Sequence, residues 1–206
     1  MSMMRVLVSS IVLGGLGASV SAAPVDLSSW LVNGTGNWIL ETTNQPNDSA
    51  RQTRNSAPTV LHNNQNSQGT TLSGTITPLR DGDDDFIGFV LGYMDGDITN
   101  SGADTSNSGI DYLLFDWKQG TQAGWNRGTS LSRVTGDIRT CGTCTASDAW
   151  QHEGAVNFIT RGNNFGNVGY VDNTSYTFDI LFSANRVKID INGATEFDIL
   201  ASTLGA

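Results

Sequence analysis

The chain of 206 residues contains few basic residues, glutamates, prolines, histidines and cysteines. Its 11 Lys and Arg residues are outnumbered by 20 Asp and Glu residues, which gives a formal net charge of −9. Nucleic acid is therefore excluded as a partner, because binding to phosphate needs a basic surface. Glutamate occurs only at positions 41, 153 and 196, so nearly all of the acidity is aspartate. With Gly, Thr, Asn and Ser abundant, this composition predicts short strands joined by turns.

Two cysteines, Cys141 and Cys144, occur three residues apart in the run RTCGTCTA. In an exported protein they are expected to form a local disulfide that staples a loop. The alternative is a redox C-x-x-C motif, which normally opens a helix beside a strand. The sequence that follows has no helical pattern, which favours the staple. Two cysteines with no histidine nearby do not form a zinc-binding pattern.

The only long hydrophobic run lies at the N-terminus. One basic residue, Arg5, precedes an apolar stretch over residues 6–20, and small residues at 20–22 suit signal peptidase. Residues 1–22 are thus predicted to be a signal peptide, cleaved after Ala22. The apolar stretch is short for a membrane span. The mature chain, residues 23–206, is expected to be a single soluble domain outside the cytoplasm.

Alternating or densely apolar segments predict strands at residues 38–40, 70–78, 85–93 and 110–118. Polar segments at 43–56, 99–109 and 120–128 are predicted to be loops. Near the end, residues 176–182, 186–191 and 194–199 alternate, and Asn192-Gly193 separates the last two segments. An Asn-Gly pair between alternating segments is typical of a tight hairpin, so these segments predict a three-stranded meander. Together the strands predict an all-β sandwich or jelly roll of two antiparallel sheets.

Aspartates flank the apolar segment 85–93. Asp83, Asp84 and Asp85 precede it, Asp95 and Asp97 follow it, and Asp111 begins the next strand. Calcium takes six to eight oxygen ligands, so carboxylates at this density are candidate ligands. The two groups lie at opposite ends of one strand, and two separate sites are as consistent with the pattern as one. The alternative is a solvated acidic loop that aids solubility. The run DGDDDFIGF lacks the glycine spacing of an EF-hand.

The runs DDDFIGFVLGYMD (83–95) and DYLLFDWKQG (111–120) resemble the signature of the thrombospondin C-terminal domain family. Further similar runs are SLSRVTG, AWQHEG, NVGYVDNTSYTFDI and VKIDINGATEFDI, so that the resemblance covers residues 25–199. It implies a lectin-like jelly roll of an extracellular, calcium-binding, adhesion-related protein, with the Asp83–Asp85 triplet among the calcium ligands. Bacterial exported members often end in a sorting tail, and family members continue with further strands. This chain ends at DILASTLGA, so a longer form is expected.

Catalysis is not expected. A jelly-roll glycosidase needs two carboxylates facing across a groove, and no Glu-x-Asp-x-x-Glu run occurs. His152 and Glu153 form an adjacent acid–base pair, but neighbouring residues of a strand point to opposite faces. His62 and His152 are the only histidines, and no Gly-x-Ser-x-Gly motif supports a Ser-His-Asp triad.

Two tryptophans, Trp125 and Trp150, fall near loops. An exposed indole stacks on sugar rings, and Trp125 has Asn126 and Arg127 beside it, which suits a polar ligand. The alternative is ordinary packing. The favoured function is a calcium-binding adhesion or matrix-binding module, secreted or held at the cell surface, with an extracellular matrix or surface glycan or protein as its partner. The alternative function is a carbohydrate-binding, lectin-like domain.

Overall fold

The computed structural model describes residues 3–11, 24–54, 58–80, 85–98, 109–122, 124–136, 138 and 148–204, without the side chains of 3–11. Over these ranges the regular secondary structure is almost entirely β-strand, with one turn of α-helix and one turn of 3-10 helix. The elements, in chain order, are β1 (Met3–Ile11), β2 (Leu31–Gly34), β3 (Trp38–Glu41), β4 (Ser49–Gln52), β5 (Thr59–His62), β6 (Thr70–Leu79), β7 (Phe86–Leu91), β8 (Tyr112–Lys118), β9 (Gly128–Val134), α1 (Asp148–Gln151), β10 (Val156–Arg161), β11 (Tyr176–Phe182), β12 (Arg186–Ile191), β13 (Ala194–Leu200) and η1 (Ala201–Thr203).

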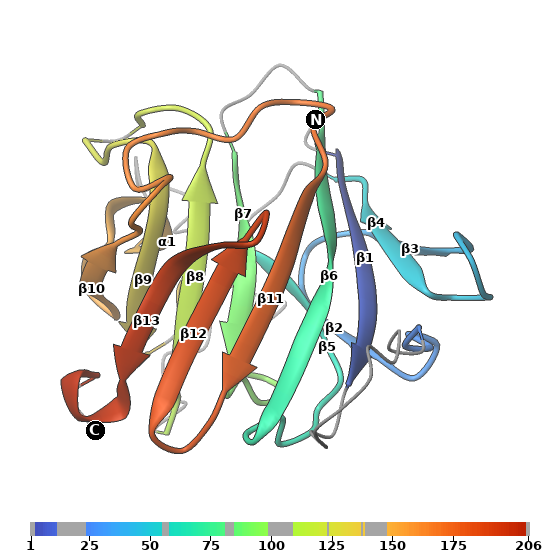
Figure 1. Ribbon diagram of the computed structural model, residues 1–206, viewed down its shortest axis with the longest axis horizontal. Coiled ribbons are helices and arrows are strands. Elements are labelled where there is room, and N and C mark those ends of the chain that lie inside the picture. The colour runs from blue at the N-terminus through green and yellow to red at the C-terminus, as the bar shows by residue number, and fades with distance from the viewer. Residues whose placement is uncertain are drawn as a thin grey trace.

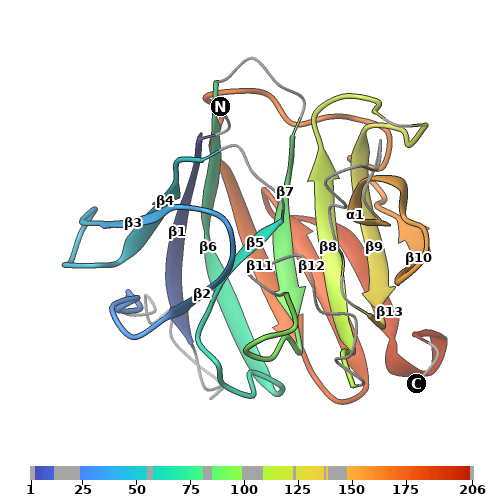
Figure 2. The same cartoon turned by 180° about the vertical axis from the view of Figure 1, so that it is seen from behind.

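Two antiparallel sheets pack face to face, as Figures 1 and 2 show from opposite sides. The larger sheet has the strand order β13-β12-β11-β6-β1-β4-β3, and the smaller has the order β10-β9-β8-β7. A further pair, β2 and β5, lies beside β7 at one side of the sandwich (Figure 2). The predicted all-β sandwich of two antiparallel sheets is confirmed.

The C-terminal meander forms as its local pattern predicts. Strands β11, β12 and β13 pair antiparallel in sequence order. Asn192 and Gly193 join the last two with φ values of 51° and 76°. Positive φ at both positions is what a type I′ turn requires, and Asn and Gly adopt it at little cost. This hairpin fixes which residues of β12 and β13 face the core.

The main core lies between the two sheets and centres on β8, all of whose residues are buried. Phe115 packs against Phe89 of β7 and against Phe197 of β13, with ring centroids 5.5 Å and 5.7 Å away. Trp117 packs against Tyr176 of β11. A second cluster, which includes Tyr112, Leu114 and Val156, covers the other face of β8. A strand with two covered faces explains why β8 is so densely apolar in sequence.

Several sequence-based expectations need correction. The segment 43–56 was predicted to be a loop, but it contains β4, whose residues pair with β1 and β3. A short helix, α1, lies a few residues after Cys144, where no helical segment was expected. The cysteines themselves, Cys141 and Cys144, lie outside the described residues, as do Asp83 and Asp84. Residues 3–11 of the predicted signal peptide form β1, in the interior of the larger sheet.

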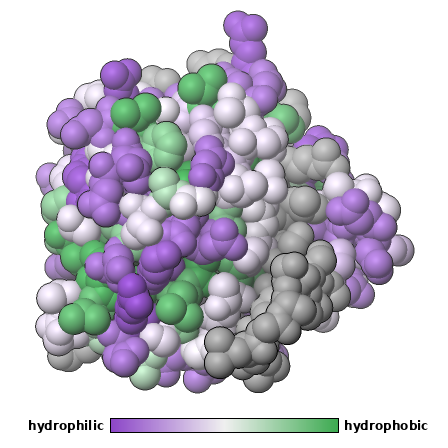
Figure 3. Space-filling model, viewed as in Figure 1, coloured by the Kyte–Doolittle hydropathy of each residue, from purple (hydrophilic) through white to green (hydrophobic). Residues whose placement is uncertain are grey.

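The outer face of the larger sheet is polar over β12 and β13. Arg186 forms two short bonds with Asp198, and Lys188 pairs with Asp190 at 2.5 Å. Figure 3 shows hydrophilic and hydrophobic residues mixed across this face. Among the described residues, no helix is long and apolar enough to cross a membrane.

Candidate functional site

The chain leaves β7 through a tight acidic loop, residues 92–98. Asn33 of β2 holds this loop. Its side-chain oxygen accepts from the Tyr93 hydroxyl at 2.8 Å and from the Gly96 amide at 2.9 Å, and its amide donates to Asp95 at 2.9 Å. The Asp97 carboxylate accepts from the amide of Met94 at 2.8 Å and closes the turn. The loop is thus held by one internal bond and by three bonds from Asn33, a residue distant in sequence.

Two carboxylates and one imidazole face each other at this loop. The Nε2 atom of His62, from β5, lies 3.5 Å from Asp95 Oδ1. Burial lowers the pKa of His62 below its ordinary value, against the opposing effect of Asp95 and Asp97. Burial also raises the pKa of Asp97, although the Met94 amide and His62 oppose this. His62 is thus neutral at pH 7. The fold therefore buries the carboxylate of Asp97 without a full positive charge on His62 to compensate it.

Of the remaining acidic candidates, Asp85 lies far from this loop, whereas the backbone of Asp111 lies next to Gly92 but its carboxylate is bound by Arg133. Asp85 is at the opposite end of β7, where its carbonyl accepts from Gln119 and from the Tyr170 hydroxyl. Asp111 forms two bonds of 2.7 Å and 2.8 Å with the guanidinium of Arg133, and these bonds lower its pKa. The structure therefore brings Asp95 and Asp97 together and separates Asp85 from them by the length of a strand.

Within the described ranges, no three His, Cys, Asp or Glu side chains form a group that could hold a metal ion. A calcium ion at the 92–98 loop would need additional oxygen ligands. Backbone carbonyl oxygens are ordinary calcium ligands, so the loop backbone suits this role, whereas the side-chain oxygen of Asn33 already accepts two hydrogen bonds. Asp83 and Asp84, which precede Asp85 in the sequence, lie outside the described residues.

A polar cluster that the sequence did not indicate lies on the outer face of the smaller sheet. His152 follows α1 with a φ of 52°. Its Nδ1 lies 2.9 Å from the hydroxyl of Ser132 in β9, and its Nε2 lies 3.2 Å from the carboxylate of Asp116 in β8. The His152 and Asp116 side chains are fully buried, and so is Ser132. These three residues are 16 and 20 positions apart along the chain, so only the β8–β9 register and the turn after α1 bring them together.

This arrangement has the residue types of a catalytic triad, but it is sealed. Ser132 lies within a strand at 0% exposure, where no substrate reaches its hydroxyl. The indole of Trp125 covers the imidazole of His152, with ring centroids 4.2 Å apart and planes 7° apart. The cluster is therefore a buried polar cluster in which the Ser132–His152 hydrogen bond ties the segment after α1 to the sheet, while His152 Nε2 and the Asp116 carboxylate meet at 3.2 Å without hydrogen-bond geometry. Glu153 is exposed beside it and does not belong to it.

The aromatic residue predicted for ligand binding is half-buried. Besides stacking on His152, Trp125 has the guanidinium of Arg161 over its ring at 4.8 Å and contacts the ring of Phe158 edge-on. Phe158 itself is 42% exposed. Arg127 is exposed and donates to the carbonyl of Asn167 at 3.3 Å. Trp125 is thus in large part a packing residue, and Phe158 presents the more open aromatic surface.

No protein-family model and no curated protein matches this chain. The resemblance to the thrombospondin C-terminal domain family consequently stays a prediction from the motifs.

Proposed function

We propose that this chain is a non-catalytic adhesion or matrix-binding module of the cell exterior that binds calcium at the loop after β7. The observation that carries the proposal is the loop that places Asp95 and Asp97 two residues apart, with Asp97 buried and the Asp95 side chain about half exposed next to the buried His62. Burial disfavours the ionised form of Asp97, and a divalent cation bound at the loop would offset that cost. The predicted signal peptide supports an extracellular setting, where calcium is available.

Calcium should raise the thermal unfolding temperature of the purified protein relative to the protein in chelator. A ligand at a hundredfold excess over its Kd stabilises a native state by about 2.7 kcal/mol, which is roughly 5–10 °C for a chain of this size. Asp97→Asn keeps an acceptor for the Met94 amide but removes a charge, so this variant should lose most of the calcium-induced shift. The measurement is calorimetry with calcium and with chelator.

Asp198→Asn is the matched control for charge, because Asp198 pairs with Arg186 on the outer face of the other sheet. It should retain the full calcium-induced shift. Asp85→Asn tests the other end of β7 separately. An unfolding temperature that calcium leaves unchanged in the wild-type protein would refute the calcium proposal, and an equal shift in all of the variants would refute the assignment to this loop.

A specific observation favours a second candidate function, glycan binding. Phe158 exposes an aromatic surface beside Trp125, and the exposed Arg127 and Asn126 lie in the adjoining loop. Apolar faces of sugar rings stack on such aromatic surfaces while arginine and amide groups bind the hydroxyls or acidic groups.

If this surface binds glycan, Phe158→Ala should weaken retention on a glycan array at least about tenfold. The stacking of one nucleic-acid base on an aromatic side chain contributes ~1–3 kcal/mol, and we expect a sugar ring on Phe158 to contribute a similar amount. Trp125→Ala should weaken it too, but it should also lower the unfolding temperature because it uncovers His152. Val171→Ala, at an exposed site elsewhere, is the control. Retention unchanged in Phe158→Ala would remove this surface from consideration.

A further inference from the structure

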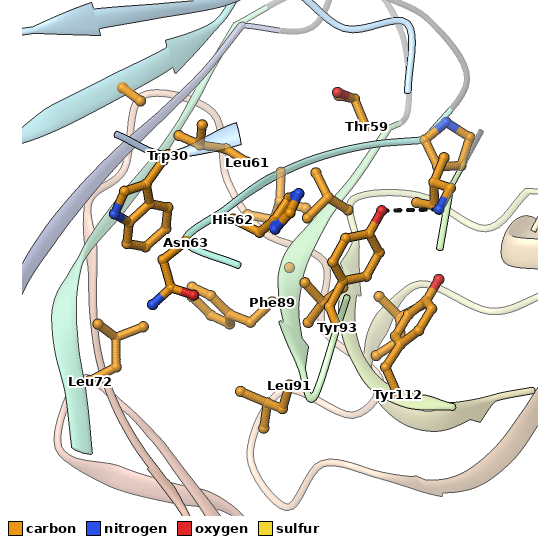
Figure 4. A pocket seen from close by; sticks show the side chains of 18 of the residues that line it. Trp30, Thr59, Leu61, His62, Asn63, Leu72, Phe89, Leu91, Tyr93 and Tyr112 are labelled. Atoms are coloured by element: carbon orange, nitrogen blue, oxygen red, sulfur yellow. Dashed lines mark hydrogen bonds between the residues drawn. The ribbon is translucent and has the colours of Figure 1, made fainter. Parts of the chain in front are cut away.

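A cavity of about 310 Å³ is lined by residues of β5, β6, β7 and β11. Figure 4 shows Trp30 and Leu72 on one side of it, Tyr93 and Tyr112 on the other, and Phe89 between them. Most of the residues that line the cavity are aliphatic or aromatic. Protein interiors leave few voids larger than a water molecule, because the walls of a void lose their packing contacts. A cavity of this size and lining is typical of a site for a small ligand.

The cavity follows a curved path around the free edge of β7. Among the described strands, β7 pairs only with β8, and β5 pairs only with β2. Phe89 and Leu91 line the cavity from the face of β7 that belongs to the main core, whereas Phe86 and Val90 line it from the opposite face. Because neighbouring residues of a strand point to opposite faces, a cavity lined from both must bend around the edge of the strand. A flexible chain can follow this bend, and a rigid ring system cannot.

One side chain in the lining offers a hydrogen bond that the described residues do not accept. His62 lines the cavity beside Phe89 and Tyr93 (Figure 4). Its Nδ1 accepts from the amide of Asn64 at 3.2 Å, so the neutral ring carries its proton on Nε2. This Nε2 is buried and has no hydrogen-bond partner, although Asp95 lies 3.5 Å away. A ligand that enters the cavity therefore gains a hydrogen bond if it carries an acceptor.

The backbone along the cavity adds donors and acceptors. Residues 59–62 of β5 and 86–91 of β7 line the cavity without interruption, so the unpaired edges of both strands lie beside it. Such an edge presents both N–H and C=O groups. An uncharged hydroxyl suits these groups because it donates and accepts. A carboxylate only accepts, and the formal net charge of −9 disfavours an anion.

The rest of the chain offers little that matches an apolar cavity. Outside the described residues, the segments 55–57, 81–84, 99–108 and 139–147 consist of small, polar or charged residues. Residues 12–23 are different, because they include several aliphatic residues, among them Leu13 and Leu16. The experiment below therefore includes a variant that tests these two leucines as competitors for the cavity.

We propose that this cavity is a binding site for a single aliphatic chain that carries an uncharged, hydroxyl-type head group. The chain bends around the edge of β7 among the apolar side chains, and the head group bonds to His62 or to the unpaired strand edges. This site is separate from the calcium and glycan proposals and does not depend on them.

The test is isothermal titration calorimetry of the full chain with the straight-chain alcohols from pentanol to nonanol. One molecule should bind per chain, and each added methylene should tighten binding about threefold to fourfold until the chain fills the cavity. Octanoate should bind at least about tenfold more weakly than octanol, because its charge would be buried without a partner. If octanoate binds as tightly as octanol, the assignment of the head group is wrong.

Two enlarged side chains test the path of the ligand. Leu72→Trp narrows the cavity between the sheets, and Val90→Phe narrows it on the opposite face of β7. Each should weaken nonanol at least about tenfold and pentanol by less, because the longer chain needs both ends of the space. Val171→Trp, at an exposed residue outside the lining, is the matched control and should change neither affinity. Unchanged nonanol binding in both cavity variants would overturn the site, and a loss in only one of them would overturn the path around β7.

The wild-type series decides the proposal even if a cavity variant fails to fold. Heats that do not saturate, or equal affinities for pentanol and nonanol, would overturn it. The variant that carries both Leu13→Ser and Leu16→Ser should bind nonanol within about threefold of wild type. Binding that tightens about tenfold or more in this variant would show that residues 12–23 compete for the cavity, and it would overturn the assignment to a ligand.

Discussion

Glu196→Ala should lower the free energy of unfolding by about 3 kcal/mol. Glu196 lies in β13 and is 1% exposed. Its carboxylate accepts from the backbone amides of Asn164 and Phe165, each at 2.9 Å, and from the Thr129 hydroxyl. Alanine would leave the buried Thr129 hydroxyl and the partly buried amides of Asn164 and Phe165 without this acceptor, and a buried polar group without a partner costs about 1–3 kcal/mol.

Glu196 also determines the course of the loop that follows β10. The two amides belong to this loop, whose Phe165 packs on Trp117 in the main core. Gly162 has no side chain at the point where Glu196 and Thr129 approach, and a Cβ there would overlap both. Loss of the carboxylate should thus loosen the loop as well as the sheet.

Urea unfolding is the measurement for Glu196, with Glu153→Ala as the control at an exposed glutamate. Glu196→Gln keeps the shape and one acceptor, so its loss should lie between those of wild type and Glu196→Ala. A thermal midpoint would fall by roughly 6–12 °C for the alanine variant. If Glu196→Ala and Glu153→Ala unfold at the same urea concentration, the carboxylate does not support the loop as described.

The parts of the fold that the sequence predicts are those in which local chemistry agrees with the final structure. Strand β11 alternates buried and exposed residues from Tyr176 to Ile180, and Asn192-Gly193 provides the turn before β13. Strand β8 is recognisable because both of its faces are covered, so that apolar residues follow one another without alternation over residues 112–115. In these segments, neighbours in sequence carry enough information to define the element.

Elements and sites that depend on distant partners could not be predicted in this way. Strand β4, with the sequence SARQ, is polar, and its burial comes from pairing with β1 and β3. The acidic residues near β7 were visible, but the sequence does not reveal that Asn33 and His62 complete the loop around Asp95. Likewise, no spacing rule links Ser132 to His152, which meet through the strand register and a turn with positive φ.

The second large effect concerns Lys118, a fully buried lysine in β8. Its ammonium donates to the carbonyl of Trp150 at 2.8 Å and lies 4.5 Å from the centroid of the Trp150 ring. Burial lowers the pKa of Lys118 from 10.5 to about 8, although the nearby Asp116 opposes this. The charged form is therefore less favourable in the folded protein than in the unfolded chain, and a shift of this size corresponds to about 3 kcal/mol.

The sign of the pH dependence follows from proton binding. Between about pH 8 and 10.5, the unfolded chain keeps the proton of Lys118 while the folded protein releases it. Stability therefore rises with pH across this interval, and below about pH 8 the full cost is present. Lys118→Met removes the titrating group, so the free energy of unfolding of wild type minus that of the variant should increase by up to about 3 kcal/mol from neutral pH to pH 10.5.

Urea titrations of both proteins at a series of pH values provide this difference, and taking the difference cancels the titration of the tyrosines common to both. Lys188→Met, at a partly exposed lysine paired with Asp190, is the control and should show no such increase. Parallel pH profiles for wild type and Lys118→Met would mean that Lys118 keeps its ordinary pKa in the folded protein. A rising difference would instead show that the buried charge of Lys118, on the outer face of the smaller sheet, costs stability. Packing against Trp150 and Phe86 does not by itself require that charge.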